Sequence, residues 1–461
     1  MSAPAEAPSL RGTLRASARL AERWLFGASA SVRLADLAHG TAVAAPHRDL
    51  EGRSVLLRVS DPLFAALALV ALDGVARRIV LCPPDLTDAL LPGVIGTAGI
   101  DLVVGDEAPP AEAAHLPVAR VALPCRPVED APPPSGRITD WAMFTSGTSG
   151  PPKMVVHTLA GLTGAIKPAK AGDPPPVWGT FYDVRRYGGL QILLRALLGE
   201  GSLVLTAPHE PMAGFLPRLA RHRVTHLTGT PSHWRRVLMS PEAGDLAPRY
   251  VRLSGEIADQ AVLDALKARF PGVPVGHAYA STEAGVGFEV NDGLEGFPAA
   301  FVGRPGEVEL RVVEGSIRVR SPRASAGYLD PAIASLTDAE GFIDTGDMVE
   351  LDGSRYRFVG RRGGVINVGG LKVHPEEIEA VINAHPAVRM SRVKARRSPI
   401  TGALVVAEAV LAESRVDEAA LRAEILADCR LRLAPFKTPA VLKFVPSLAM
   451  TAGGKLERAL G

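Results

Sequence analysis

The sequence predicts an α/β protein with a large N-terminal domain of doubly wound sheets plus a small β portion, followed by a small mobile α+β C-terminal domain. Three observations support this prediction. The chain has 461 residues, more than one hydrophobic core usually supports. Strand-length apolar runs alternate with helix-length stretches before residue 105. After Gly360 the pattern changes, and the remainder suits a domain of about 100 residues.

The first part of the chain has the pattern of parallel strands joined by crossover helices. Strands are expected at 55–59, 78–82 and 101–104, and helices at 62–75 and 86–98. The longest apolar run, residues 64–72, is much shorter than the roughly 20 residues that cross a bilayer. We therefore expect a buried helix there and no membrane partner.

The middle of the chain continues the α/β pattern and then changes character. Prolines and alanines accumulate over 109–136, which predicts a linker leading to a strand at 141–144 and a glycine-rich loop. More strands are expected at 203–205, 224–227, 250–253 and 275–279, and an antiparallel β portion at 308–320. The segment HPEEIEAVINAH, with apolar Ile378, Val381 and Ile382, predicts the first C-terminal helix.

Charge and cysteine content exclude several classes of function. There are 51 Lys plus Arg against 49 Asp plus Glu, a formal net charge of +2, and no long basic block, so no nucleic-acid surface is expected. Cys82, Cys125 and Cys429 are far apart, which argues against disulfides and a Cys-rich zinc site. The N-terminus has no secretion signal, and a cytoplasmic location is expected.

The segment TSGTSGPPK resembles a phosphate-binding loop in its chemistry. Small residues let backbone N–H groups approach a phosphate, hydroxyls add donors, and lysine supplies charge. Met154 follows the lysine, so this is not a Walker A loop. A solvated Ser/Gly turn is the alternative. The candidate nucleotide-binding residues here are Thr145, Ser146, Gly147, Thr148, Ser149, Gly150 and Lys153.

Five further motifs follow this loop in a fixed order: YASTE at 279–283, FIDTGD at 342–347, GR at 360–361, GLKVHPEEIE at 370–379 and GGK at 453–455. Together they resemble the adenylate-forming superfamily, which includes acyl- and aryl-CoA synthetases, firefly luciferase and the adenylation domains of peptide synthetases. The resemblance extends from about residue 141 to the C-terminus.

The resemblance implies nucleotide-binding roles for residues in these motifs. It puts the Tyr279 ring against adenine, where aromatic stacking is suitable, with Asp347 accepting hydrogen bonds from the ribose hydroxyls. A core tyrosine and a turn-forming aspartate are the alternatives. The other implied nucleotide-binding residues are Ser254, Gly255, Glu256, Ala280, Ser281, Thr282 and Arg361.

The resemblance also implies three catalytic residues. Thr282 resembles an α-phosphate donor, and Glu283 resembles the ligand of a Mg²⁺ ion that offsets triphosphate charge. Lys455 corresponds to the lysine that stabilises charge while the acid attacks phosphorus. A helix-capping glutamate and a solubilising lysine are the alternatives.

The acyl pocket is expected beside the segment FYDVRRYGG and the ends of two strands. Its candidate residues are Tyr182, Arg185, Tyr187, Gly188, Thr228, Gly276 and Ala280. Rings mixed with charge favour a small aromatic or polar-substituted acid, because unpaired charges in a long apolar tunnel would be costly. Arg185 is a candidate for binding a polar substituent. Alternatively, both arginines of the segment face solvent and pair with Asp183.

We expect domain boundaries at 1–361 and 365–461, with a hinge at 362–364. Gly363 and Gly364 occupy positions where relatives carry an acid or a lysine, so the hinge has wide φ/ψ freedom but lacks their ion pairs. Gly363, Gly370 and Lys372 are the candidates for the hinge and for a thiol tunnel. The part before the phosphate loop is shorter than in many relatives.

The implied reaction uses ATP and Mg²⁺ to convert a small carboxylic acid to an acyl-adenylate, after which a thiol, by preference that of CoA, displaces AMP. A carrier-protein phosphopantetheine or an amine are alternative acceptors. A nucleotide-binding regulatory protein without turnover is the alternative of another class.

Overall fold

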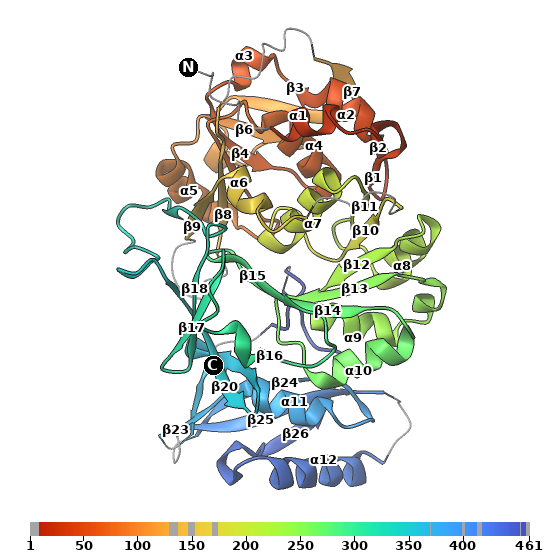
Figure 1. Cartoon of the computed structure of the whole chain (residues 1–461), viewed down its shortest axis with the longest axis vertical. Coiled ribbons are helices and arrows are strands. Elements are labelled where there is room, and N and C mark those ends of the chain that lie inside the picture. Colours follow the sequence, from red (N-terminus) through yellow and green to blue (C-terminus); the bar gives the residue numbers. More distant parts are fainter. Residues whose placement is uncertain are drawn as a thin grey trace.

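The structure is a computed structural model that describes residues 9–128, 137–145, 153–167, 174–368, 370–398, 402–412, 417–451 and 453–457. Figure 1 shows an elongated molecule, with the N-terminal elements at one end and the C-terminal domain at the other. Within the described residues, none of the helices has both the length and the apolar character that crossing a bilayer requires.

The first sheet has eight strands, of which β7, β6, β4, β5 and β8 run parallel. In spatial order it contains β19 (Gly327–Tyr328), β9 (Met154–His157), β8 (Asp140–Phe144), β5 (Arg78–Leu81), β4 (Ser54–Arg58), β6 (Leu102–Gly105), β7 (Val118–Pro127) and β3 (Gly40–Ala44). Helix α5 (Leu91–Ala98) covers one face. Helix α4 (Pro62–Leu72) begins where Asp61 accepts a hydrogen bond from Leu63 N at 2.8 Å, and packs on the other face.

The second sheet also has eight strands. In spatial order it contains β15 (Gly285–Val290), β14 (Val275–Ser281), β13 (Tyr250–Ser254), β12 (His226–Gly229), β10 (Val177–Thr180), β11 (Ser202–Val204), β1 (Trp24–Phe26) and β2 (Ser31–Arg33). One apolar cluster joins both sheets through α4 and α7 (Tyr187–Leu198). Three helices cover the opposite face of β12 to β14: α8 (Met212–Arg221), α9 (Pro231–Met239) and α10 (Gln260–Arg269).

A five-stranded antiparallel sheet forms the small β portion. It contains β16 (Phe297–Pro298), β21 (Arg355–Arg361), β20 (Ile343–Asp352), β18 (Ser316–Arg320) and β17 (Glu309–Val313). Its core includes Phe297, Ile317 and Val349. The remaining helices of the N-terminal part are α1 (Leu10–Arg15), α2 (Leu34–His39), α3 (His47–Leu50) and α6 (Leu159–Thr163), with short 3-10 turns at 20–22, 88–90, 111–113, 241–245 and 299–301.

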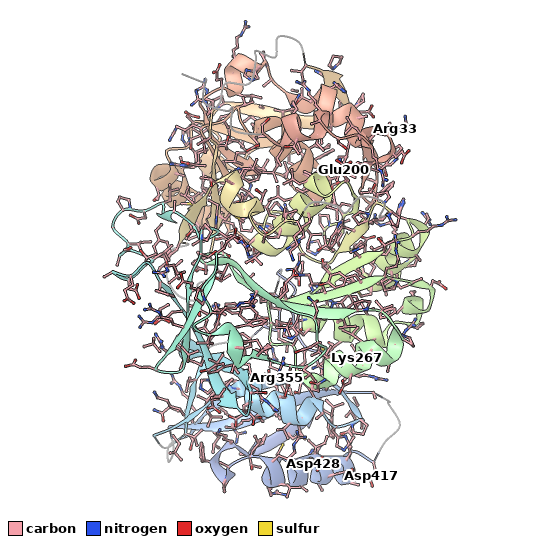
Figure 2. The ribbon with its side chains drawn as sticks, in the orientation of Figure 1. Arg33, Glu200, Lys267, Arg355, Asp417 and Asp428 are labelled. Atoms are coloured by element: carbon pink, nitrogen blue, oxygen red, sulfur yellow. The ribbon has the colours of Figure 1, made fainter. Side chains whose placement is uncertain are left out.

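The C-terminal part has its own apolar cluster, which extends from Ile366 to Leu442. It contains the hairpin β22 (Ile366–Val368) and β23 (Leu371–Val373), the sheet β24 (Val388–Ser398), β25 (Gly402–Leu411) and β26 (Val441–Phe444), helices α11 (Pro375–Asn383) and α12 (Glu418–Arg432), and 3-10 turns at 362–364 and 435–437. Asp417 caps α12, and Asp428 lies on the same outer helix (Figure 2).

The prediction of a linker over 109–136 was wrong for its middle part, because β7 (Val118–Pro127) lies there and pairs with β6 and β3. In this strand Ala119 and Val121 are buried, whereas Val118 and Arg120 are exposed. That alternation is the strand signal, and the prolines on both sides obscured it.

Candidate active site

The phosphate-loop motif connects two antiparallel strands, β8 and β9. The residues at its ends are close together, because Thr145 N donates to Lys153 O at 2.9 Å. The Lys153 ammonium lies 5.7 Å from the centroid of the Tyr328 ring. The central candidates, Ser146 to Gly150, lie outside the described residues. Of this motif the structure therefore places Thr145 and Lys153, side by side where β8 ends and β9 begins.

His157 links this hairpin to the YASTE segment. It lies in β9, and its Nε2 is 2.7 Å from the carbonyl oxygen of Thr282. Burial lowers the pKa of His157, so the ring is neutral at pH 7 and Nε2–H is the donor. This partly buried hydrogen bond holds the backbone immediately before Glu283. Thr282 and Glu283 are thereby held beside the strand that follows the phosphate loop.

Tyr279, Asp347 and Arg361 form one hydrogen-bonded group. The Tyr279 hydroxyl donates to Asp347 Oδ2 at 2.7 Å, and Arg361 Nε donates to Asp347 Oδ1 at 2.7 Å. The Tyr279 ring also stacks with Phe288 and Phe358 at centroid distances of 5.2 and 5.3 Å. Burial, and next the Asp347 charge, raises the pKa of Tyr279, so its hydroxyl is a donor. The three motifs that supply these residues, YASTE, FIDTGD and GR, meet here.

The segment after β13 supplies the next part of the site. The Tyr182 hydroxyl donates a hydrogen bond to the Ser254 carbonyl oxygen at 2.9 Å. Gly255 has φ +86°, a conformation that favours glycine. The Glu256 carboxylate accepts from Ser232 N at 2.9 Å with one oxygen and from Leu456 N at 2.8 Å with the other. Glu256 therefore joins the start of α9 to the C-terminal segment.

The C-terminal GGK segment is docked on the large domain. Thr230 Oγ1 donates to the carbonyl oxygen of Gly454 at 2.7 Å. Gly454 has φ +71°, and a Cβ added there would lie 1.8 Å from Cε1 of His233, so no side chain fits. In Figure 1 the dark-blue end of the described chain returns to the middle of the molecule. The docking places Lys455 beside the residues described above.

Lys455 lies among charged groups of the large domain. Its Cε would be 3.5 Å from a Cβ built on Gly255. Burial, and next the Arg361 guanidinium, lowers the pKa of Lys455, while Glu256 and Asp347 act in the opposite direction. Lys455 as a whole is exposed, so water weakens each of these charge interactions. The structure thus brings Lys455, Asp347 and Glu256 into one site.

The structure brings together three of the acyl-pocket candidates. Tyr182, Tyr187 and Ala280 belong to the apolar cluster between the two large sheets. The Tyr182 ring also lies against Gly188, where an added Cβ would be 3.6 Å from Tyr182 Cγ. These positions remain predictions for substrate contact.

The environments of three other candidates differ from the prediction. Arg185 is 3% exposed, and its donors go to the Asp183 carboxylate and the Val59 carbonyl. The alternative of solvent-facing arginines was therefore wrong for Arg185, although the pairing with Asp183 is present. Thr228 is fully buried, and its hydroxyl donates to Thr180 Oγ1 at 3.0 Å. The space beside Gly276 is filled, because an added Cβ would lie 2.1 Å from Asn291 Oδ1.

The hinge and tunnel candidates lie apart from these contacts. Gly363 lies in a 3-10 turn between β21 and β22, and an added Cβ there would meet nothing within 4 Å. Gly370, with φ +88°, forms the β22–β23 turn, and its N–H donates to Asn367 Oδ1 at 2.8 Å. Lys372 is exposed on β23. The domain boundaries and the thiol tunnel remain predictions.

Sequence reasoning missed the two residues that seat the C-terminal segment. Thr230 and His233 form a capping box at the start of α9, with Pro231 at the first helical position. Burial, and next Arg236, lowers the pKa of His233 to about 3, so its Nδ1 accepts from Thr230 N at 3.2 Å. The string TPSH contained this helix-start signal, but it did not indicate a partner in the C-terminal domain.

The fold and the site define a class of enzyme in which a small C-terminal domain brings a lysine to the carboxyl edge of a large sheet. The chain matches the AMP-binding enzyme family over residues 78–329 and the AMP-binding enzyme C-terminal domain over residues 377–455. It therefore belongs to the AMP-binding enzyme family. The predictions of the adenylate-forming superfamily and of the fold class are confirmed, and the predicted enzyme class, an AMP-forming acid–thiol ligase, agrees with the family's named CoA ligases.

Three similar proteins illustrate the match. The chain is 29% identical over 346 residues to 4-coumarate–CoA ligase 2 of Oryza sativa subsp. japonica. This match covers 68% of this chain and 60% of that protein. It is 30% identical over 330 residues to 2-succinylbenzoate–CoA ligase of Listeria innocua, with 68% of each covered. The o-succinylbenzoate CoA synthetase structure from Bacillus subtilis has a TM-score of 0.74 at 20% identity, covering 98% of this chain and 97% of that one.

Proposed function

We propose that this enzyme uses ATP to activate a small aromatic carboxylic acid as its acyl-adenylate and then transfers the acyl group to CoA, releasing pyrophosphate and AMP. The observation that carries the proposal is the docked C-terminal segment. The Thr230–Gly454 and Glu256–Leu456 hydrogen bonds bring Lys455 to the Tyr279–Asp347–Arg361 group. A protein that only bound a nucleotide would not need this lysine.

The first step joins a carboxylate oxygen of the acid to the α-phosphorus of ATP and breaks the bond to pyrophosphate. Negative charge increases on the α-phosphate oxygens during this step, and a positioned ammonium stabilises it. Lys455 fits this role, and Thr282 fits as a second donor. In the second step a thiol sulfur attacks the acyl carbon, and AMP leaves with the bonding pair.

The nucleotide would lie across the edge formed by these motifs. Asp347 would exchange its present partners, Tyr279 and Arg361, for the ribose hydroxyls, since one carboxylate accepts several hydrogen bonds. The loop between Thr145 and Lys153 would receive the β- and γ-phosphates. Both roles follow the motif assignment and are supported by the meeting of these segments in one site.

Glu283 is the residue that would hold Mg²⁺. Among the described residues there is no group of three or more His, Cys, Asp and Glu placed to hold a metal ion. A single carboxylate nevertheless fits Mg²⁺, which commonly takes one or two carboxylates together with substrate phosphates and waters. When bound, the ion would neutralise triphosphate charge.

Two observations support a small aromatic acid. The chain's relatives include ligases named for 4-coumarate and 2-succinylbenzoate. Tyr182, Tyr187 and Ala280 belong to the apolar cluster between the two large sheets, and flat rings with the Ala280 methyl suit a short, planar acid. CoA as acceptor is supported by the same names, and a carrier-protein thiol or an amine are the alternatives.

We also propose that the 362–364 turn is a hinge about which the C-terminal domain rotates between the two steps. Lys455 is docked in the present arrangement, whereas within the described part of the chain the Gly370 turn and Lys372 form no hydrogen bond with the residues around Lys455. A cytoplasmic location is supported by the free thiols of Cys82, Cys125 and Cys429.

Pyrophosphate exchange with a panel of acids tests the proposed function. Benzoate-type acids should support exchange better than long-chain fatty acids. Lys455→Ala should reduce exchange by about 100-fold or more, while ATP binding persists. Lys443→Ala is the matched control, because Lys443 is an exposed lysine of β26 in the same domain. Wild-type exchange by Lys455→Ala, or no exchange with any acid, would contradict the proposal.

A further inference from the structure

A pair of arginines and one glutamate meet beside the tyrosines of the predicted acyl pocket. Arg252 is in β13, Arg195 is in α7 and Glu289 is in β15. Arg252 Nη2 lies 2.6 Å from Glu289 Oε1, and Arg195 Nη2 lies 3.7 Å from the same oxygen. Three separate elements thus place two guanidinium groups around one carboxylate.

The cluster carries more positive than negative charge. Within the described residues, Glu289 is the one carboxylate within ion-pair distance of either arginine. Arg252 is 7% exposed. Nε of Arg195 is buried and has no hydrogen-bond partner among the described residues. Two guanidinium groups against one carboxylate leave one positive charge without a protein counter-ion.

Burial makes this imbalance costly. Removing an ion from water is strongly unfavourable unless a partner and hydrogen bonds replace the water. In agreement, burial first, and then Arg252, lowers the pKa of Arg195 to about 10, while Glu289 opposes the shift. A purely structural ion pair would need one arginine. The second arginine indicates an additional anion that binds there.

The cluster lies at the distance from Lys455 that the far end of a bound acid would reach. Arg252 precedes Ser254 by two residues in β13, which is about 7 Å along a strand. Ser254 accepts the Tyr182 hydroxyl and is followed by Gly255, which lies beside Lys455. An acid activated near Lys455 and extending past Tyr182 would therefore meet Arg252 at its far end.

The charge of Arg252 also acts on both tyrosines of the predicted acyl pocket, so Arg252 lies near them. Burial raises the pKa of both Tyr182 and Tyr187, and the positive charge of Arg252 acts against this rise in each case. Arg323 is also near Tyr187, but its guanidinium is already paired with Glu307 at 2.9 Å. Arg323 and Glu307 balance each other, whereas Arg252 and Arg195 share the single carboxylate of Glu289, so the positive charge that a ligand could neutralise lies on the Arg252–Arg195 pair.

We propose that Arg252 and Arg195 bind a second anionic group of the substrate, a carboxylate or a sulfonate, at the end opposite the carboxylate that is activated. This inference rests on the proposed function and narrows its substrate class to short acids with two anionic ends. Arg252 donates directly to that group, and Arg195 supplies the second charge. Glu289 holds both guanidinium groups in place.

Matched acids that differ only in the distal charge test the proposal. Pyrophosphate exchange is measured with terephthalate against 4-carbamoylbenzoate, with 4-sulfobenzoate against 4-sulfamoylbenzoate, and with benzoate as reference. The charged member of at least one pair should be preferred by roughly tenfold or more in kcat/KM, as expected for hydrogen bonds to a charged group. The two pairs distinguish a carboxylate from a sulfonate.

Variants then assign the preference to the cluster. Arg252→Gln should abolish it, whereas Glu289→Gln should preserve or increase it, because the protein's own anion is removed. Glu289 is partly exposed, so this second variant should fold. Arg218→Gln is the matched control. Arg218, in α8, is also a mostly buried arginine, and it is paired with Glu210 at 2.7 Å.

The outcomes separate this inference from the proposed function. Equal use of charged and neutral acids by the wild type would overturn the subsite while leaving the activity in place. A preference that survives Arg252→Gln would also overturn it. No exchange with any acid would contradict the proposed function, and the subsite with it. A preference lost in Arg252→Gln and kept in Arg218→Gln would support the proposal.

Discussion

The two faces of strands β12, β13 and β14 have opposite chemical character. On the face under α8, α9 and α10, Leu227, Val251 and Val275 are aligned in register and fully apolar. On the other face, the next row is Thr228, Arg252 and Gly276. Because side chains alternate along a strand, one sheet can be a packing surface on one face and a binding surface on the other.

This difference separates stability from selectivity within the same strands. The apolar face excludes water from three helices, and its contribution scales with the buried area. On the polar face the Thr228 hydroxyl is bonded to Thr180 and Asn291 fills the space beside Gly276, so Arg252 is the side chain of this row that supplies charge near Tyr182 and Tyr187. Variants of the two faces should therefore affect different measurements.

The largest expected effect is on the apolar face. Leu253 is fully buried against the α8–α10 cluster. Leu253→Ala should lower the free energy of unfolding by about 3 kcal/mol, because it removes buried methyl groups and leaves a cavity. Denaturant titration measures this change. The relative use of different acids by the folded fraction should remain that of the wild type, and altered acid preference with unchanged stability would contradict the comparison.

The docking of the C-terminal segment that carries Lys455 should be nearly as sensitive to substitution. Gly454→Ala puts a methyl group into the His233 ring at a position with φ +71°, so the segment carrying Lys455 must move. A displacement of about 1 Å can reduce a catalysed rate by about 100-fold, or roughly 2.7 kcal/mol. Pyrophosphate exchange should fall accordingly, with stability little changed.

Gly453→Ala is the control for this variant. A Cβ on Gly453 would have its nearest neighbours, in Arg186 and Thr451, at 3.7 Å, an ordinary contact distance. Exchange by this variant should therefore remain close to that of the wild type. Equal losses in both variants would show that any substitution in the segment disturbs Lys455, and that the His233 contact is not the cause.

Much of the fold could be predicted because its signals are local. Apolar runs fixed β4, β5 and α4 within a few residues, and the motif order identified the two-domain architecture. The linker prediction was wrong at β7 because a strand of mixed polarity between prolines has a weak periodic signal. Arg252 carried a signal that was not used, a charged residue inside an otherwise apolar strand segment.

Long-range contacts could not be predicted from local patterns. Nothing near Gly276 in the sequence indicates that Asn291 fills the space beside it. Arg185 binds the Val59 carbonyl, 126 residues away, and Thr230 binds the Gly454 carbonyl, 224 residues away. Such pairings depend on how the sheets pack, so only the structure reveals which candidate side chains are already occupied.

A smaller effect is expected from the single hydroxyl that holds the docked segment. Thr230→Val keeps the shape but removes the donor to the Gly454 carbonyl and the acceptor for His233 N. Losing such bonds costs about 1 kcal/mol, so exchange should fall roughly fivefold. Thr230→Ser should restore most of the activity. Full activity in the valine variant would show that Glu256 alone seats the segment.

The smallest expected effect is the pH dependence of stability that two histidines produce. His233 and His226 have pKa values lowered to about 3 and about 4, in each case first by burial. The unfolded chain takes up protons on both below about pH 6.5, whereas the folded protein does not. The stabilising contribution is therefore present above pH 6.5 and is lost as the pH falls towards these lowered values.

Asp73, in the first sheet's core, acts in the opposite sense. Burial first raises its pKa to about 6, against hydrogen bonds from Leu10 N at 2.8 Å and Trp141 Nε1 at 3.2 Å. Between about pH 6 and pH 4 the folded protein binds a proton that the unfolded chain does not, so acidification favours folding at this site. Asp73 thus offsets part of the histidine effect.

Denaturant titrations at pH 7.5 and 5.5 measure the balance. Each histidine should cost about 1 kcal/mol over this interval. His233→Asn should reduce the acid loss of stability relative to the wild type, and Asp73→Asn should increase it. Leu253→Ala, on the apolar face, should lower the free energy of unfolding equally at both pH values. If the two titratable variants changed the pH dependence in the same direction, the assignment of its sign to His233 and Asp73 would be wrong.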